Sequence, residues 1–341
     1  MQVQWVMLSH SRRSFLKSGA GAAAAGLAGC LGVTGGSGPT QLGLNFTVPI
    51  ENLASLLSIP ELQNELQNIE DEYTLDVSQN ASTADSLTAM ASGEADVALV
   101  TPVSYASAVM EEPVPGNISA VGFGFWDAHP DNYGITAFAH PDSGITDPED
   151  IEGAKLGINA INTGIQATYR KQLLQLDLNP EEAVEYVEQG FPTFTAALAD
   201  GVFDVGIYPA TFAVGARDAG YVEVFSSQDV WEEAYPFVYI AAANDSLDSK
   251  GDAIRALMTD YTDLVDYLYE NRDEVVSLAS DHFDLDRSLV DAFFLTEKDY
   301  YRDEVEIDFD RFQFIIDEMH RLEFIDDTFD VQEYATNDYL E

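Results

Sequence analysis

The chain has 341 residues, of which 46% are hydrophobic and 11% aromatic, so it can form packed cores and is long enough for two domains. It carries 60 acidic and 15 basic residues, and the net charge of −45 argues against nucleic acid and anionic membrane surfaces as partners, because phosphates are bound by clustered Lys and Arg. Its single cysteine excludes an intramolecular disulfide and a cysteine-based metal cluster.

The excess of acidic residues predicts that the protein works in concentrated salt. In dilute buffer the like charges repel one another and destabilise the compact state. At about 1 M salt the Debye length falls to roughly 3 Å, which screens this repulsion. We therefore interpret most of the acidic side chains as a surface adapted to the salt of a halophilic microbe, without a role in ligand binding.

The first 30 residues have the pattern of an export signal. Ser11–Lys17 matches the S-R-R-x-F-L-K pattern of twin-arginine signals, and the small residues Gly19–Gly29 follow as its apolar region. That region is shorter than the ~20 apolar residues of a transmembrane helix. The Leu-Ala-Gly-Cys stretch resembles a lipobox, with cleavage before Cys30 and a lipid on its thiol. We predict a twin-arginine signal with lipobox at 1–30, a tether at 31–40, and anchoring to the outer face of the cell membrane.

From Leu42 onward, apolar runs alternate with amphipathic stretches. The spacing predicts strands at 42–48, 73–77 and 97–100, and helices at 49–69 and 83–92. A series of this kind forms a parallel sheet, which would be the core of a first lobe. Two further strands, at 121–125 and 135–139, lead towards a second lobe.

The second lobe repeats this plan. Strands are expected at 156–158, 184–187, 205–207 and 222–225, with helices at 163–176, 193–199 and 209–219. The strand at 237–242 returns the chain to the first lobe, and amphipathic helices from Leu247 onward are expected to pack against it. We predict an α/β fold of mostly parallel sheets flanked by helices, with 41–138 plus 238–341 as lobe I, 139–237 as lobe II and a two-strand hinge.

Three segments carry a family resemblance: Ser92–Ala98, Asp147–Gly157 and Ala196–Gly206. In their order and spacing they resemble the periplasmic substrate-binding proteins of nitrate, sulfonate and taurine importers, a group similar to the binders of thiamine-pyrimidine precursors. The resemblance implies the type II periplasmic-binding fold, capture of a solute by hinge closure, and an ABC permease with its ATPase as partners of a monomer. The acidity and the aromatic-rich stretch 122–133 depart from the family pattern.

The candidate binding site follows from the sheet. Ligands of open parallel sheets bind outside the carboxyl ends of the strands, where helix N-termini present backbone amides. The residues selected in these loops, together with one aromatic residue at a predicted rim, are Pro49, Asn52, Ser82, Thr83, Thr101, Ser104, Tyr105, Trp126, Asn159, Asn162, Thr163, Gly164, Phe191, Thr193 and Tyr208. Several of these hydroxyls and amides equally suit helix N-caps, which stabilise a helix whether or not a ligand binds.

The chemistry of the ligand stays open at this point. The twelve basic residues that follow Cys30 all lie outside the selected loops, so an anion would depend on helix amides and hydroxyls without an arginine fork. The aromatic residues could instead enclose a flat ring, or bind an ammonium group with Glu51 or Asp127 as counter-charge. A sulfonate, a pyrimidine-like compound and an amine are therefore all candidate solutes.

An enzyme is the alternative. The five histidines show no metal-ligand spacing, and the sequence contains no serine-nucleophile elbow, P-loop or full dinucleotide fingerprint. We expect no cofactor, metal or catalytic residue. A pyrimidine-precursor synthase shares the fold that the resemblance implies, whereas an adhesive surface protein would show repeats. The sequence therefore favours a lipid-anchored receptor that delivers a small solute to an importer.

Overall fold

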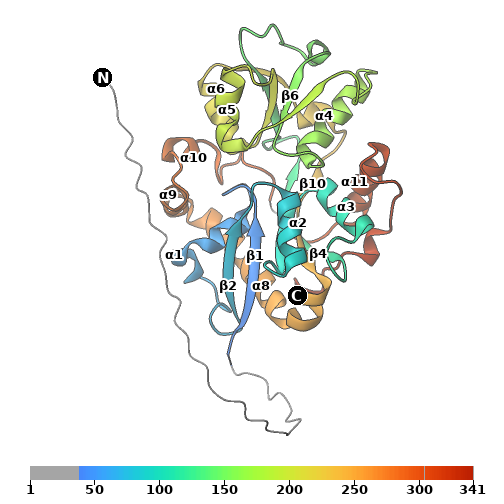
Figure 1. The fold of residues 1–341 in the computed structure, drawn as a ribbon. Helices are drawn as coiled ribbons and strands as arrows, with labels where there is room; N and C mark the ends of the chain where they lie inside the picture. The colour runs from blue at the N-terminus through green and yellow to red at the C-terminus, as the bar shows by residue number, and fades with distance from the viewer. Residues whose placement is uncertain (1–37, 303, 341) are drawn as a thin grey trace, which may run out of the picture. The chain divides into compact units, whose positions relative to one another are not determined.

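The computed structural model describes residues 38–302 and 304–340. Within these residues the strands form two five-stranded sheets, each flanked by helices (Figure 1). The first sheet has the order β2-β1-β3-β10-β4. Its strands are β1 (Thr40–Phe46), β2 (Tyr73–Gln79), β3 (Val97–Val100), β4 (Ile118–Asp127) and β10 (Tyr235–Ala243). We call the part of the chain around this sheet the first lobe.

The second sheet, at the core of the second lobe, repeats this arrangement with the order β7-β6-β8-β5-β9. Its strands are β5 (Thr136–Ala139), β6 (Lys155–Ile158), β7 (Glu185–Glu188), β8 (Val205–Tyr208) and β9 (Val222–Ser226). In each sheet the fourth strand of the order, β10 or β5, pairs antiparallel with both neighbours, and the other pairs are parallel. The sheets are therefore mixed, with four strands of each running in one direction.

The helices follow the strands along the chain. Those before β10 are η1 (Leu53–Ser58), α1 (Pro60–Gln63), α2 (Thr83–Ser92), α3 (Pro102–Glu111), η2 (Pro148–Ile151), α4 (Gly164–Gln175), α5 (Phe191–Ala199), α6 (Ala210–Asp218) and α7 (Ser227–Val230). Those after β10 are α8 (Asn244–Glu270), α9 (Arg272–His282), α10 (Arg287–Phe293), α11 (Phe309–Arg321) and η3 (Val331–Glu333). None of the helices in the described part of the chain is both long enough and apolar enough to cross a membrane.

Local sequence signals explain the elements that were predicted best. The structure confirms the helix at 83–92 and the strand at 97–100. Ser82 caps the start of α2 by accepting a hydrogen bond from the backbone N–H of Asp85, and Gly93 ends it with a φ of 77°. β3 is buried at all four positions, as its continuous apolar run predicts.

Two predictions in the first lobe were wrong. Residues 49–69 do not form one helix: η1 ends at Ser58, Ile59 is extended, and Pro60 starts the short α1. The proline ring disfavours helical backbone in the residue before it, which breaks the segment. The segment after Thr101, expected as a loop, forms α3 with Pro102 in its first turn, where the missing N–H costs nothing.

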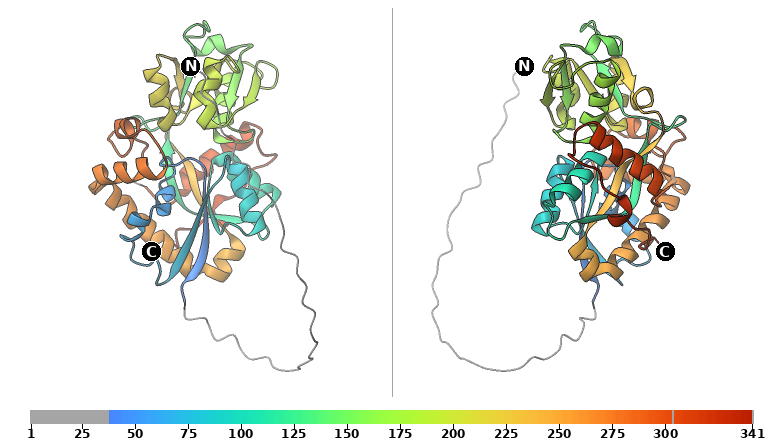
Figure 2. Two further views of the ribbon diagram at one scale, coloured as in Figure 1. Left: turned by 60° about the vertical axis from the view of Figure 1, so that its left-hand side comes forward. Right: turned by 90° about the vertical axis from the view of Figure 1, so that its right-hand side faces the viewer.

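The C-terminal helices pack mainly against the first lobe, as predicted. α8 contacts β1, β4 and β10, and α11 contacts α3 and β10. Figure 2 shows these orange and red helices around the first sheet. The apolar stripes of α8 and α11 are buried. In contrast, α10 contacts α6 of the second lobe, so the C-terminal segment joins the two lobes as well.

The bounds of β5 and β10 show where the chain passes from one lobe to the other. β5 begins at Thr136 and belongs to the second sheet, and β10 begins at Tyr235 and belongs to the first. Each change of sheet therefore comes a few residues before the expected bounds of 41–138 plus 238–341 and 139–237. The reason is that residues 136–139 pair along their whole length with β8. As domain bounds, these limits stay a prediction. The signal, the lipobox and the first part of the tether lie outside the described residues.

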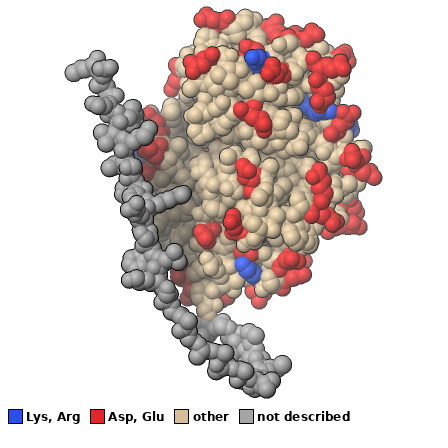
Figure 3. Space-filling view, viewed as in Figure 1, with Lys and Arg blue, Asp and Glu red and all other residues tan. Residues whose placement is uncertain are grey.

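The surface carries the charge that the composition predicts. Figure 3 shows Asp and Glu side chains spread over the visible face of both lobes, with few Lys and Arg among them. The interior is mainly apolar, and the polar residues buried in it include a small charged set with Glu51, Asp127, Asp299 and Arg302. These four lie near the junction between the lobes.

Candidate functional site

Two chain crossings join the lobes, and one buried carboxylate ties them together. Asp127 ends β4 at the start of the first crossing. Its side chain accepts hydrogen bonds from the N–H of Ile135 at 3.1 Å, the hydroxyl of Ser227 at 2.7 Å and the hydroxyl of Tyr235 at 3.2 Å. Burial raises the pKa of Asp127 to about 6, and these hydrogen bonds oppose that shift. Both crossings are thus held at one point.

A small cavity of about 50 Å³ lies where the strand ends of the two lobes meet. Its walls come from the loops that the strand rule selected, after β1, β2 and β3 in the first lobe and after β6, β7 and β8 in the second. Seven of the predicted site residues line it: Asn52, Thr83, Thr101, Asn159, Thr163, Gly164 and Phe191. A wider groove adjoins the cavity and shares Thr47, Val48 and Phe191 with it.

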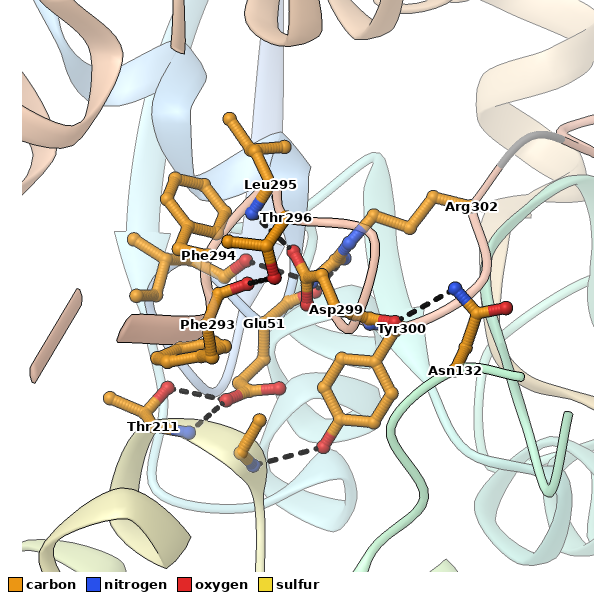
Figure 4. A network of polar contacts seen from close by, with 12 residues as sticks. Glu51, Asn132, Thr211, Phe293, Phe294, Leu295, Thr296, Asp299, Tyr300 and Arg302 are labelled. Atoms are coloured by element: carbon orange, nitrogen blue, oxygen red, sulfur yellow. Dashed lines mark hydrogen bonds and ion pairs between the residues drawn. The ribbon is translucent and has the colours of Figure 1, made fainter. Parts of the chain in front are cut away.

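Glu51 is the acidic residue of the cavity wall and lies in the turn after β1. One carboxylate oxygen, Oε1, accepts hydrogen bonds from the backbone N–H of Thr211, at 2.7 Å, and from the Thr211 hydroxyl (Figure 4). The other oxygen, Oε2, is buried and has no donor among the described residues. Burial raises the pKa of Glu51 to about 7, although Thr211 and Arg302 oppose the shift.

Arg302 supports the turn that carries Glu51. Its guanidinium donates to the backbone carbonyl of Glu51 at 2.6 Å and forms an ion pair with Asp299 at 3.2 Å. It also lies over the rings of Phe125 and Tyr300, at 5.4 and 5.3 Å from their centroids. The sequence placed Arg302 outside the selected loops, and the structure brings it behind the cavity wall without making it part of the lining.

Three of the N-terminal amides expected to face a ligand are used between the lobes. At α6, the N–H of Ala210 donates to the Tyr300 hydroxyl at 3.1 Å, and that of Thr211 donates to Glu51. At α4, the N–H of Gly164 lies 3.3 Å from the Thr101 hydroxyl. These helix ends, which would attract an anion, are therefore occupied by side chains of the first lobe.

Close contact between the lobes depends on a glycine. A Cβ on Gly164 would lie 2.7 Å from Cε2 of Phe237 and 3.3 Å from Cβ of Thr101. Beside it, the hydroxyls of Thr83 and Ser104 are hydrogen-bonded, and the Ser104 hydroxyl lies 3.4 Å from the carbonyl of Asn162. Ser104 and Asn162 thus stand next to the cavity as contacts between the lobes.

Other predicted site residues lie away from the cavity for clear local reasons. Tyr105 is fully buried and donates its hydroxyl to the Tyr334 carbonyl. Trp126 packs edge-on against Phe123, and its indole N–H donates to Glu304. The remaining positions have these roles: Pro49 lines the adjoining groove, Ser82 caps α2, Thr193 bonds the carbonyl of Gly190, and Tyr208 packs in the second core.

The sequence reasoning missed most of the apolar wall. Phe125 and Phe237 come from the ends of β4 and β10, and their rings lie 5.6 Å apart. The sequence pattern did mark both as buried strand residues at the crossings. Tyr300, stacked on Phe125 at 4.1 Å, belongs to the irregular segment between α10 and α11. No local signal connects that segment with the cavity.

The histidines of the described residues stand outside the cavity. His129 stacks on Tyr301, at 4.5 Å between ring centroids, and His140 lies beside Tyr221. Within residues 38–302 and 304–340, no group of three or more His, Cys, Asp or Glu is arranged to hold a metal ion. The groups that line the cavity are a carboxylate, several hydroxyls and amides, and aromatic rings.

Comparisons with known proteins agree with this fold. The sequence model of a protein family described as NMT1/THI5 like matches residues 71–275. No curated protein matches the sequence. The fold is similar to that of the alkanesulfonate-binding protein SsuA from Xanthomonas axonopodis pv. citri bound to MOPS, with a TM-score of 0.72, 12% identity, and coverage of 87% of this chain and 98% of that one.

Two further structures are similar. The ligand binding component of an ABC-type import system from Staphylococcus aureus with zinc bound has a TM-score of 0.71 and 16% identity, over 88% of this chain and 98% of that one. The periplasmic nitrate-binding protein NrtA from Synechocystis PCC 6803 has a TM-score of 0.71 and 11% identity, over 89% of this chain and 88% of that one. The predicted α/β two-lobed periplasmic-binding fold is thereby confirmed.

Proposed function

Because the chain belongs to the NMT1/THI5-like family, we propose that it is the solute-binding receptor of an ABC importer and captures a small organic solute between its two lobes. The observation that carries this proposal is the cavity lined by strand ends from both lobes. Such a position is typical of ligand sites in open α/β sheets. The names of the similar structures, which are binding components of importers, support it.

Capture by hinge closure is part of the proposal. The lobes are connected by two crossings that meet at Asp127, and this arrangement allows rotation about a narrow region. Beside the cavity, the hydrogen bonds between Glu51 and Thr211 hold the two lobes together. A solute that contacts both lobes binds better when they are together, so it shifts the population towards the closed arrangement.

We further propose that the protein works outside the cytoplasm. The twin-arginine pattern around Arg12 and Arg13 supports export of a folded chain, and the lipobox supports a lipid anchor at Cys30. A monomer held in this way could deliver its solute to a permease whose ATPase lies on the cytoplasmic side. The acidity supports a halophilic source, because molar salt screens a charge of −45.

The test is ligand binding without turnover. The protein is purified in molar KCl and then denatured. Any small molecule that it releases is identified by mass spectrometry. Returned to the folded protein, that molecule should raise the melting temperature, because binding to the folded state alone stabilises it by about 2.7 kcal/mol at 100 times Kd. Sulfonates, pyrimidines and amines are tested in parallel.

Two results would contradict the proposal. If no molecule is released and no compound shifts the melting temperature, the receptor function is wrong. If a bound compound is instead converted, as recovered product would show, the protein is an enzyme of the pyrimidine-precursor synthase type or a similar class. Small-angle scattering provides the separate test of closure, since the radius of gyration should fall when solute is added.

A further inference from the structure

The cavity contains a strong hydrogen-bond acceptor whose partner is not part of the described protein. Oε2 of Glu51 is buried, lines the cavity and receives no hydrogen bond from any described residue. Oε1 of the same carboxylate is held by Thr211, so the side chain cannot turn away without losing that contact. Leaving a buried acceptor unpaired destabilises the folded state, and more so when the group is charged. A ligand that donates to Oε2 would remove this cost.

The charges around the cavity favour a positive ligand. Among the described residues that line it, Glu51 is the acidic side chain, and none is Lys or Arg. The nearest buried cation, Arg302, is already paired with Asp299 and bonded to backbone carbonyls behind the wall. When Glu51 is ionised, the buried group of Glu51, Asp299 and Arg302 carries one excess negative charge.

Some of the backbone amides that would bind an anion already have acceptors in the first lobe. At the N-terminus of α6, backbone N–H groups donate to Glu51 and to the Tyr300 hydroxyl. At the N-terminus of α4, the N–H of Gly164 donates to the Thr101 hydroxyl. An incoming sulfonate or nitrate would also meet the Glu51 carboxylate in a site with little water. The repulsion between like charges is large where solvent screening is weak. The site therefore differs in charge from what an anion requires.

The remaining walls suit a compact organic cation. Phe125, Phe191, Phe237 and Tyr300 line the cavity, and the faces of such rings attract cations. A volume of about 50 Å³ corresponds to roughly four water molecules, so the bound group is small. Thr83, Thr101 and Asn159 add polar groups for orientation.

We propose that the solute is a compact organic cation with at least one N–H, such as a primary or secondary amine or an amidine. Glu51 is its charge partner, and Oε2 of Glu51 accepts a hydrogen bond from that N–H. This inference rests on the proposed receptor function and specifies its ligand. The N–H requirement follows from the unpaired oxygen, because a quaternary ammonium group has nothing to donate. The sequence left sulfonates, pyrimidines and amines open, and the structure favours the last of these.

Calorimetric titration of three sets of probes tests the inference. The first set contains propylamine, acetamidine and related N–H cations, the second their quaternary analogues, and the third methanesulfonate and nitrate. We expect the first set to bind most tightly. In Glu51→Gln, the affinity for these cations should fall about 10- to 100-fold, as expected when a charged hydrogen bond is lost. Glu188→Gln is the matched control: this exposed carboxylate accepts from the N–H of Ile161 outside the cavity, and its affinities should not change.

The parent protein offers a second readout if the variant does not fold. Cation affinity should fall on acidification as Glu51 becomes protonated, since its pKa is raised to about 7. The titratable and charged groups that face Glu51 are Arg302, which is paired with Asp299, and the side chains of Tyr133 and Tyr300. Burial raises the pKa of both tyrosines above its ordinary value. These tyrosines therefore do not titrate in this range.

Each outcome decides between the two proposals. Tight binding of anions or quaternary compounds, unchanged in Glu51→Gln and at low pH, would overturn the cation inference and leave the receptor function intact. Binding of no probe in any set, with no molecule released from the purified protein, would overturn the receptor function and this inference with it. Selective binding of N–H cations that depends on Glu51 supports both.

Discussion

The carboxylate of Glu51, in the first lobe, accepts the backbone N–H of Thr211, in the second, at a distance of 2.7 Å. Thr211 lies in the first turn of α6, so the negative group meets the positive end of the helix. This contact closes the cavity from one side, and the other oxygen of the same group remains available to a ligand. In the proposed receptor, one side chain thus joins lobe contact with solute recognition.

Replacing Glu51 by Gln should change how stability depends on pH. The pKa of Glu51 is raised from 4.5 to about 7, so the folded protein binds the proton more tightly than the unfolded chain. Its contribution to the free energy of unfolding is full below pH 4.5 and is lost as the pH rises to about 7, a change of about 3 kcal/mol. Relative to the parent, Glu51→Gln should therefore become more stable as the pH rises from 5 to 8.

Thermal melts of both proteins across this range, in the same salt, measure that difference. Asp127 also has a raised pKa, but it is present in both proteins, so its effect largely cancels. A difference that stays constant from pH 5 to pH 8 would show that Glu51 is not perturbed in the folded state.

Replacing Gly164 by Ala should hold the lobes apart. The added methyl group would lie 2.7 Å from the Phe237 ring, and relieving such a contact costs about 1–3 kcal/mol. Because that cost applies only when the lobes touch, we expect solute affinity to fall about tenfold or more, with little change in the melting temperature without solute. Gly215→Ala is the control: a Cβ on this glycine of α6 would have no atom within 4 Å, so solute affinity should be unchanged. Equal affinities for parent and Gly164→Ala would contradict the prediction.

A buried ion pair between α4 and α11 should contribute to stability even in strong salt. Nζ of Lys171 lies 2.6 Å from Oε2 of Glu318, and 4.8 Å from the centre of the Trp231 ring. Lys171→Met leaves the buried carboxylate with Arg321 as its remaining partner, and we expect a loss of about 3 kcal/mol in denaturant unfolding. Adding Glu318→Leu should recover most of this loss, because no buried charge is then left unpaired.

The control for that pair is Lys155→Met. Lys155 is exposed on β6, so its replacement should change stability by less than about 0.5 kcal/mol. If Lys171→Met is as mild as Lys155→Met, or if the double variant is no better than the single one, the buried pair is not stabilising.

Salt should stabilise the folded chain strongly. With 60 acidic and 15 basic residues, repulsion is strong at about 0.1 M KCl and largely screened at about 2 M. We expect the melting temperature to rise continuously over this range. At pH values low enough to protonate most carboxylates, the same salt series should have a much smaller effect. A melting temperature that is independent of salt at neutral pH would refute the halophilic interpretation of the charge.

The sequence by itself determined the order of the strands and of most helices between them, because burial periodicity and end signals are local. Ser82 and Gly93 define α2 wherever the helix lies, and the strand rule then identified loops that line the cavity. Pro60 is an equally local signal for a break, but the apolar spacing alone predicted one helix through it.

Only the tertiary structure decided the character of the site. Arg302 reaches the carbonyl of Glu51 from 251 positions away, and the Tyr300 hydroxyl occupies the start of α6. Such contacts arise when separate elements pack, and no periodicity or spacing encodes them. The charge of a cavity depends on which groups are paired behind its wall. The sequence could therefore locate the candidate site but could not show that an unpaired carboxylate oxygen lies in it.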